Sequence, residues 1–266
     1  MHQKSPAFAP SRPSATVVLV RDAQSGPEML LMLRHAKSSF GDSYVFPGGV
    51  LEATDDLLGN HCAGRNDADA STTLGMSAGG SSYYSGAIRE LFEEAGILLA
   101  RTPQGNWADP DRYATSRDNL NAGTLLWADF VQKNELTLAY DALHYFSFWI
   151  TPRELPKRFS TRFFVAALPN GQVATHCGGE LTDSRWISAS GAIAASKAGK
   201  IVLPQPTVST LRDLSGFDTI DSILNWARER GILGVSACRP AIISIDGHQQ
   251  VVMPDSPDYP SYPDTR

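Results

Sequence analysis

The chain has 266 residues, of which 42% are hydrophobic and 19% charged, a composition typical of one elaborated globular domain. A formal net charge of −5 argues against general binding to nucleic acid or to an anionic membrane, so any bound phosphate must be met by local Arg or Lys side chains. The three cysteines form no close pair and no metal-ligand spacing, which argues against a disulfide framework and predicts a reducing, cytoplasmic location.

The first predicted elements form a hairpin. We expect residues 1–13 to be a loose arm, because they are polar and rich in proline. The run 15–20 is β-branched, too short for a signal core or a membrane span, and ends at a turn-rich segment. A second strand at 28–34 ends on Arg34, a basic side chain that either approaches a bound phosphate or is a plain surface charge.

A glycine turn and a polar segment follow. The short strand 44–46 leads into Pro47-Gly48-Gly49, where the missing side chains let the backbone approach a ligand or a metal closely; a plain tight turn is the alternative. Residues 56–82 are rich in small and polar residues and have almost no apolar periodicity. They predict a flexible surface insertion, either a lid or a tolerated loop.

The next helix carries a cluster of carboxylates. Glu90, Glu93 and Glu94 stand at i, i+3 and i+4, so a helix places them on one face. Like charges at this spacing destabilise an isolated helix, which suggests a compensating cation. Hard oxygen ligands suit Mg²⁺ or Mn²⁺, and Gly96 offers the C-terminal cap.

The second half of the chain predicts a mixture of strands and helices. We expect a helix over 118–133, strands over 143–150 and 162–168, and a helix over 188–198. A mostly helical C-terminal extension follows at 204–255. It ends in a hairpin in which 249–253 folds back on 240–245, before an irregular tail at 256–266.

Two of these features together resemble the Nudix box. The stretch Arg89-Glu90-Leu91-Phe92-Glu93-Glu94-Ala95-Gly96-Ile97 matches every fixed position of the second half of the box. If the first half starts at Gly49, Asp55 stands where the pattern has its first Glu. The pattern then expects Arg at position 63, and Arg89 lies 26 residues later, so the box is split by an insertion.

A split box of this kind resembles the coenzyme A diphosphatases related to the peroxisomal Nudix hydrolase of type 19. The resemblance extends over Trp149-Ile150-Thr151-Pro152 and over Thr161 to Pro169. It implies an α/β fold, the Nudix α/β/α sandwich with a mixed central sheet, over residues 14–203. The insertion within the box and the helical C-terminal extension would be additions to that domain.

The resemblance also implies roles for individual residues. Glu90, Glu93 and Glu94 would be catalytic and would hold Mg²⁺ or Mn²⁺ with the backbone of Gly49, while Arg89 would orient them. The remaining candidates are Asp55 as the first-half acid, Glu180 as an assisting ligand or base, and Arg34, Gly48 and Arg162 as substrate-binding residues. For Arg162 the alternative is a structural ion pair, and for Glu180 an exposed loop carboxylate.

The implied activity is metal-dependent hydrolysis of a phosphoric anhydride. Coenzyme A or an acyl-coenzyme A would give 3′,5′-ADP and (acyl-)phosphopantetheine; ADP-ribose or a dinucleotide such as NADH is the alternative substrate. A hypothesis of another class is a nucleotide-sensing Nudix module without turnover. The expected partner is a small nucleotide, with no nucleic acid and no membrane; many relatives dimerise, so a homodimer is also an option.

Overall fold

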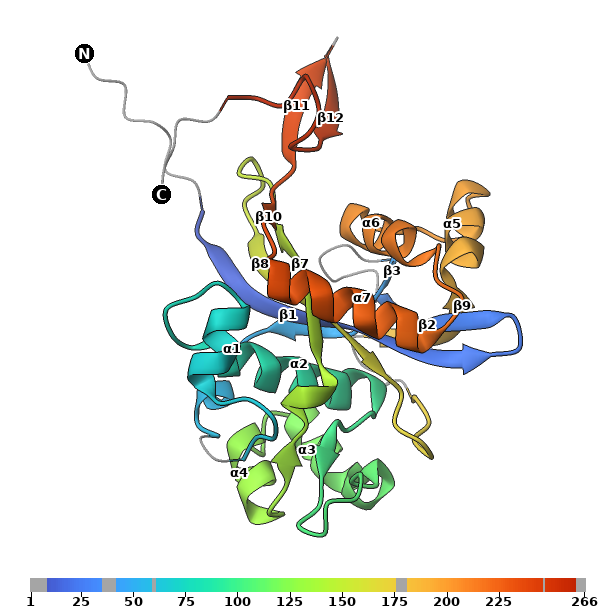
Figure 1. Cartoon of the computed structure of the whole chain (residues 1–266). Coiled ribbons are helices and arrows are strands. Elements are labelled where there is room, and N and C mark those ends of the chain that lie inside the picture. The colour runs from blue at the N-terminus through green and yellow to red at the C-terminus, as the bar shows by residue number, and fades with distance from the viewer. Residues whose placement is uncertain (1–8, 35–41, 59–60, 176–180, 246, 262–266) are drawn as a thin grey trace, which may run out of the picture.

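A computed structural model describes residues 9–34, 42–58, 61–175, 181–245 and 247–261. Over these residues the chain forms an eight-stranded sheet in the order β10-β7-β8-β1-β2-β3, in which β4 also pairs with β1 and β9 with β2. Helices α1 to α4 lie on one face of the sheet and α5 to α7 on the other (Figure 1). The predicted α/β/α sandwich with a mixed central sheet is therefore confirmed.

Strand β1 (Ser11–Ala23) is the centre of the sheet. It pairs antiparallel with β2 (Gly26–Arg34), as the predicted hairpin requires, and parallel with β8 (Arg158–Ala167) from Ser11 to Val20. The expected arm therefore ends earlier than predicted: residues 11–13 already belong to the strand, because β8 supplies them with hydrogen-bond partners that the local sequence does not show.

Alternating side chains of β1 separate two hydrophobic cores. Ala15, Val17 and Leu19 pack on the face covered by α2 (Gly80–Ala95). Val18 and Val20 pack on the face covered by α5 to α7. Because successive side chains of a strand point to opposite faces, one β-branched run can serve both cores.

The insertion at 56–82 is more ordered than the sequence predicts. It contains helix α1 (Asp67–Thr73), whose first turn is capped where the Asn66 side chain accepts a hydrogen bond from the Asp69 backbone N–H at 2.9 Å. A Cβ on Gly80 would lie 2.2 Å from the Ser71 nitrogen, so α1 and α2 meet at the backbone. The sequence pattern predicted a flexible insertion, and this helix was missed. Only Ala70 and Ser71 of α1 are buried, which is too few to give a helical periodicity of apolar residues.

The expected helix over 118–133 is two helices. Helix α3 (Ala114–Asn121) and helix α4 (Trp127–Lys133) are separated by Gly123, whose φ of 68° is left-handed and ends the first helix. The short elements of this half of the chain are β3 (Tyr44–Val45), β4 (Gly48–Val50), β5 (Ala100–Arg101), β6 (Thr137–Leu138), β7 (His144–Ile150) and β9 (Leu181–Ser188), with 3₁₀ turns at Ala53–Asp56, Pro110–Tyr113 and Tyr140–Ala142.

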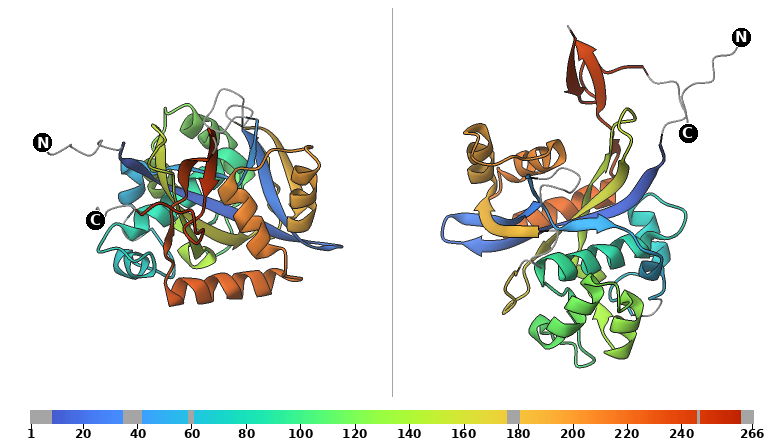
Figure 2. Two further views of the ribbon diagram at one scale, coloured as in Figure 1. Left: turned by 90° about the horizontal axis from the view of Figure 1, so that it is seen from above. Right: turned by 180° about the vertical axis from the view of Figure 1, so that it is seen from behind.

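The C-terminal part covers the second face and adds a separate hairpin. It consists of α5 (Ala189–Lys197), α6 (Gln205–Leu214), α7 (Ile220–Leu233), β10 (Ala237–Cys238), β11 (Ala241–Ile245) and β12 (His248–Val252). Strands β11 and β12 pair antiparallel as predicted, and the hairpin rises from one end of the sandwich (Figure 2, right). Among the described residues, no helix is long and apolar enough to cross a membrane.

Candidate active site

Helix α2 presents the carboxylate cluster, which we define as Glu90, Glu93 and Glu94. The opposite side of the helix is apolar, and Ile88, Leu91 and Phe92 are fully buried against the sheet. Gly96 ends the helix with a φ of 68°, and its N–H bonds back to the carbonyl of Phe92. The buried face fixes the rotation of the helix, so the cluster points toward β4, the short strand that pairs with β1.

Arg89 is the centre of the ionic network at this site. Its Nε and Nη2 donate to the two carboxylate oxygens of Asp55 at 3.0 and 3.1 Å. Its Nη1 donates to Glu90 at 3.1 Å and to Glu93 at 3.2 Å. The guanidinium is only 1% exposed. Burial alone would lower the pKa of Arg89, but Glu90, Asp55 and Glu93 together raise it, so the charge is fixed.

Asp55 lies where the split box places its first acid, although the insertion separates it from the helix in sequence. Its carboxylate is 1% exposed, accepts both bonds from Arg89 and a third from the Glu52 backbone N–H at 2.8 Å. Burial raises the pKa of Asp55 although Arg89 acts against the shift. The contacts of this side chain orient Arg89, and through it the cluster.

The carboxylates of the cluster are held in a poorly solvated environment. Burial, reinforced by Glu93, raises the pKa of Glu90 to about 7, although Arg89 opposes the shift. Burial likewise raises the pKa of Glu93. Glu94 is 7% exposed and accepts a hydrogen bond from the Gly48 backbone N–H at 2.7 Å. An additional positive charge next to these groups would stabilise their ionised forms.

The glycine turn fits closely over the cluster. A Cβ on Gly49 would lie 2.3 Å from a carboxylate oxygen of Glu90, and one on Gly48 would lie 2.4 Å from the Ala15 carbonyl oxygen. Any larger residue would therefore displace either the cluster or strand β1. The two glycines allow the backbone to approach the carboxylates closely. The predicted approach of this backbone to a ligand or a metal stays a prediction.

The chemistry of the donor set fits a hard divalent cation. All three side chains offer carboxylate oxygens, the ligands that Mg²⁺ and Mn²⁺ prefer. Within the described parts of the chain, no three acidic, histidine or cysteine side chains are already gathered as a metal site, because Glu90 and Glu93 are turned toward Arg89. The carboxylates that would hold a cation include the two that Arg89 orients.

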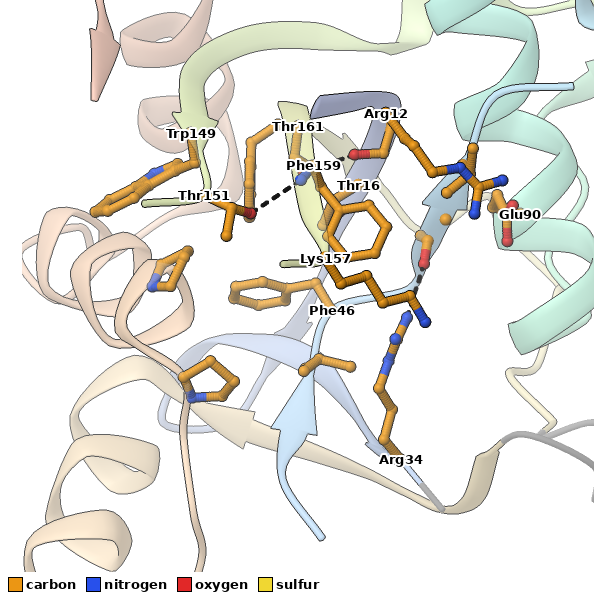
Figure 3. Close-up of a pocket in the computed structure, with 18 of the residues that line it drawn as sticks. Arg12, Thr16, Arg34, Phe46, Glu90, Trp149, Thr151, Lys157, Phe159 and Thr161 are labelled. Carbon is orange, nitrogen blue, oxygen red and sulfur yellow. Dashed lines mark hydrogen bonds between the residues drawn. The ribbon is translucent and has the colours of Figure 1, made fainter. Parts of the chain in front are cut away.

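The cluster forms one end of a pocket of about 1240 Å³ between the sheet and the C-terminal part of the chain. Arg34, from the end of β2, lines it and donates to the Gly48 carbonyl at 3.2 Å. Arg12 and Lys157 line the same pocket, together with Phe46, Trp149 and Phe159 (Figure 3). Cationic and aromatic side chains therefore share one cavity with the carboxylates.

Arg162 is not part of this pocket, which corrects its assignment as a substrate-binding residue. Thr161 and Phe163, its neighbours in β8, line the pocket, so Arg162 points to the opposite face of the sheet. There it is 7% exposed, and its guanidinium carbon lies 4.3 Å from the centre of the Tyr83 ring and 4.4 Å from that of Phe148. Its role is cation–π packing rather than contact with a phosphate. Glu180, the candidate assisting acid, lies outside the described residues.

Sequence reasoning missed the residues that reach the pocket from distant segments. Arg12 lies in the segment expected to be an arm, and its signal was the alternation of Arg12, Ser14 and Thr16 along one face of β1. Ile242 and Val251 come from the C-terminal hairpin. No local pattern indicates that this hairpin lies beside the glycine turn, since that depends on long-range packing.

Comparisons with known proteins agree with this geometry. A profile described as the NUDT19 Nudix domain matches residues 65–214. The acyl-coenzyme A diphosphatase NUDT19 of Homo sapiens is 26% identical over 275 residues, which cover 89% of this chain and 71% of the human protein. The putative nudix hydrolase 7 of Caenorhabditis elegans is 28% identical over 77% of this chain, and the match spans only 60% of that protein.

A solved structure supports the fold. The crystal structure of a NUDIX hydrolase from Alicyclobacillus acidocaldarius superposes with a TM-score of 0.69 and 23% sequence identity. The match covers 82% of this chain and 97% of the bacterial one. It therefore includes most of the sandwich described above.

Proposed function

Because the chain is a Nudix hydrolase that belongs to the NUDT19 Nudix domain family, we propose that it hydrolyses the phosphoric anhydride of coenzyme A or of an acyl-coenzyme A with the help of Mg²⁺ or Mn²⁺. The products would be 3′,5′-ADP and (acyl-)phosphopantetheine. The NUDT19 relatives are named acyl-coenzyme A diphosphatases, which supports this choice of substrate.

One observation carries the proposal. The carboxylate cluster, the glycine turn and the Arg34 side chain converge on one end of a single large pocket. A volume of about 1240 Å³ exceeds the roughly 300–1,000 Å³ typical of small-molecule sites. A diphosphate joined to a large group at each side would fit a pocket of this size and polarity.

The residues around the pocket would have different roles in this reaction. Arg89, fixed by Asp55, holds Glu90 and Glu93 at the pocket edge, and Glu94 is held by the Gly48 N–H. A divalent cation bound by the cluster and the Gly49 backbone would neutralise the anhydride oxygens and lower the pKa of an attacking water. Arg34 would bind the charge of the diphosphate.

The reaction itself is an addition of water across the P–O–P bridge. The water oxygen forms a bond to one phosphorus, the bond from that phosphorus to the bridging oxygen breaks, and the proton of water ends on the released phosphate. The carboxylate cluster, with a cation bound to it, would contribute positioning and electrostatic stabilisation. Losing one cluster carboxylate should therefore affect the rate much more than the fold.

The test is a substrate panel with identification of the products. Purified protein is incubated with coenzyme A, octanoyl-coenzyme A, ADP-ribose and NADH, each with Mg²⁺, Mn²⁺ or EDTA, and the products are separated by chromatography. We expect 3′,5′-ADP from coenzyme A or its thioester only when metal is present. Cleavage of ADP-ribose or NADH alone would overturn the proposed choice of substrate. Tight nucleotide binding without any cleavage would favour a nucleotide-sensing module.

A further inference from the structure

The pocket has an apolar end that the hydrolysis does not use. Six side chains with apolar surface line the pocket: Phe46, Trp149, Leu155, Phe159, Ile242 and Val251. Trp149 and Phe46 lie on the side of the pocket away from Glu90 (Figure 3). The polar and apolar ends belong to one cavity, so a single ligand can occupy both.

The C-terminal hairpin is built to face this cavity. Ile242 and Val251 are register partners, and both line the pocket. The adjacent pair, Ala241 and Val252, is buried. Because neighbouring pairs in a hairpin point to opposite faces, one face anchors the hairpin and the other forms a wall of the pocket.

The hairpin is also held in place against the β7–β8 loop. The backbone N–H of Ile242 donates to the Glu154 carboxylate at 3.3 Å, and Leu155 of the same loop lines the pocket. Val251 nevertheless remains 55% exposed. A large aliphatic side chain that is directed into a cavity and left in water gains free energy when an apolar ligand covers it.

Two polar groups beside this wall, the Thr151 hydroxyl and the Trp149 indole N–H, have partners within the protein. The Thr151 hydroxyl accepts a hydrogen bond from the Phe159 backbone N–H at 3.0 Å. The Trp149 indole N–H donates to the Ser147 hydroxyl at 3.1 Å. A nucleotide base would need free donors and acceptors for recognition, whereas a chain of methylene groups needs only the aliphatic and aromatic surface that this end provides.

We infer that strands β11 and β12, with the β7–β8 loop, form the binding site for the acyl chain of an acyl-coenzyme A and select substrates by chain length. This inference rests on the proposed function, because it places the diphosphate at the carboxylate cluster. Each buried methylene of the chain adds about fourfold to binding while the wall covers it.

The test compares kcat/KM for coenzyme A, butyryl-, octanoyl- and lauroyl-coenzyme A with Mg²⁺. In the wild type we expect the value to rise with chain length. The double variant Ile242→Ser/Val251→Ser should lose at least about tenfold on octanoyl-coenzyme A and less than about twofold on coenzyme A. Gln250→Ser changes the residue next to Val251 on the other hairpin face and should keep the wild-type profile.

The outcomes separate this inference from the proposed hydrolysis. Equal losses on coenzyme A and octanoyl-coenzyme A would overturn it, because the wall would then bind a part common to both, such as the adenine. An unchanged profile would also overturn it. If the wild type cleaves neither coenzyme A nor any of the acyl-coenzyme A substrates, the proposed hydrolysis is wrong. Calorimetric binding of coenzyme A and octanoyl-coenzyme A in EDTA then decides the inference: tighter binding of octanoyl-coenzyme A that the double variant loses supports it, and equal binding contradicts it.

Discussion

The two faces of the sheet differ in how completely they are covered. On the first face, α2 packs over β1, and the side chains that orient the carboxylate cluster, Arg89 and Asp55, are about 99% buried. On the second face, the helices cover only part of the sheet, and the pocket lies over the beginning of β1 and of β8. The closed face fixes the orientation of the carboxylate cluster, and the open face leaves room for the pocket.

The difference explains why two buried arginines have different roles. Arg89 lies on the closed face and donates hydrogen bonds to three carboxylates, so its charge orders the cluster. Arg162 lies within the closed face between two aromatic rings, away from the pocket. Burial of an arginine therefore does not by itself indicate that it belongs to the site. The groups that its guanidinium contacts indicate its role.

Removing the Arg89 charge should have the largest effect. Arg89→Met leaves Asp55, Glu90 and Glu93 as buried carboxylates without their cation, which costs about 3–5 kcal/mol in the free energy of unfolding. Urea denaturation measures this loss, and activity should vanish in the same variant. A stability within about 1 kcal/mol of the wild type would contradict the role assigned to the network.

Glu93→Gln should separate activity from stability. Glutamine keeps the size of the side chain but removes a ligand charge, so kcat should fall by on the order of a thousandfold. Because burial raises the pKa of Glu93, the neutral amide should change the free energy of unfolding by only about 1 kcal/mol or less. Glu229→Gln, on the exposed surface of α7, is the matched control for both measurements.

The part of the second face that α7 covers contains a pH-sensitive group. Burial, with Arg228 and Arg65 nearby, lowers the pKa of His144 to about 4, while Asp141 acts against this shift. Between pH 6.5 and 4 the unfolded chain binds a proton that the folded chain does not, so the contribution of His144 is present above pH 6.5 and is lost as the pH falls through this range. The loss should amount to about 3 kcal/mol.

Equilibrium unfolding at a series of pH values measures this contribution. His144→Gln should remain neutral and show a shallower fall in stability between pH 6.5 and 4. His248→Gln, on the exposed hairpin, should follow the wild type. Parallel curves for the wild type and His144→Gln would mean that His144 is protonated in the folded protein.

Arg162→Met should have the smallest effect on activity. Methionine keeps the contacts with the rings of Tyr83 and Phe148 and loses a long hydrogen bond to the Leu74 carbonyl. Among the described residues no carboxylate pairs with Arg162, so stability should change by about 1–2 kcal/mol at most. Substrate assays should give a kcat/KM within about twofold of the wild type. A loss of more than tenfold in kcat/KM would show that Arg162 contacts the substrate after all.

Local sequence rules predicted the parts of the site that lie on one element. The spacing of the three glutamates, the Gly96 cap and the apolar side of α2 all follow from helix geometry. The resemblance assigned the first-half acid to Asp55 by counting from Gly49, and the structure places the Asp55 carboxylate within hydrogen-bond distance of Arg89. The close contact between Gly49 and Glu90 agrees with that register.

The rest depends on long-range register, which one sequence does not contain. Arg162 was a candidate for the pocket because it interrupts an otherwise apolar strand start, and the sequence alone does not show which face of the strand it occupies. Arg12 was overlooked because its strand forms only when β8 pairs with it, about 150 residues later in the chain. The pocket wall formed by β11 and β12 likewise depends on long-range packing and was therefore not predicted.

The most direct test of the central claim is Mn²⁺ binding measured by electron paramagnetic resonance, without any substrate. We predict that the wild type binds Mn²⁺, and that Glu90→Gln and Glu93→Gln each weaken binding at least tenfold, because each removes a carboxylate of the closed-face cluster. Glu229→Gln should bind as the wild type does. If both cluster variants bind Mn²⁺ with wild-type affinity, the metal lies elsewhere and the assignment of the cluster is wrong.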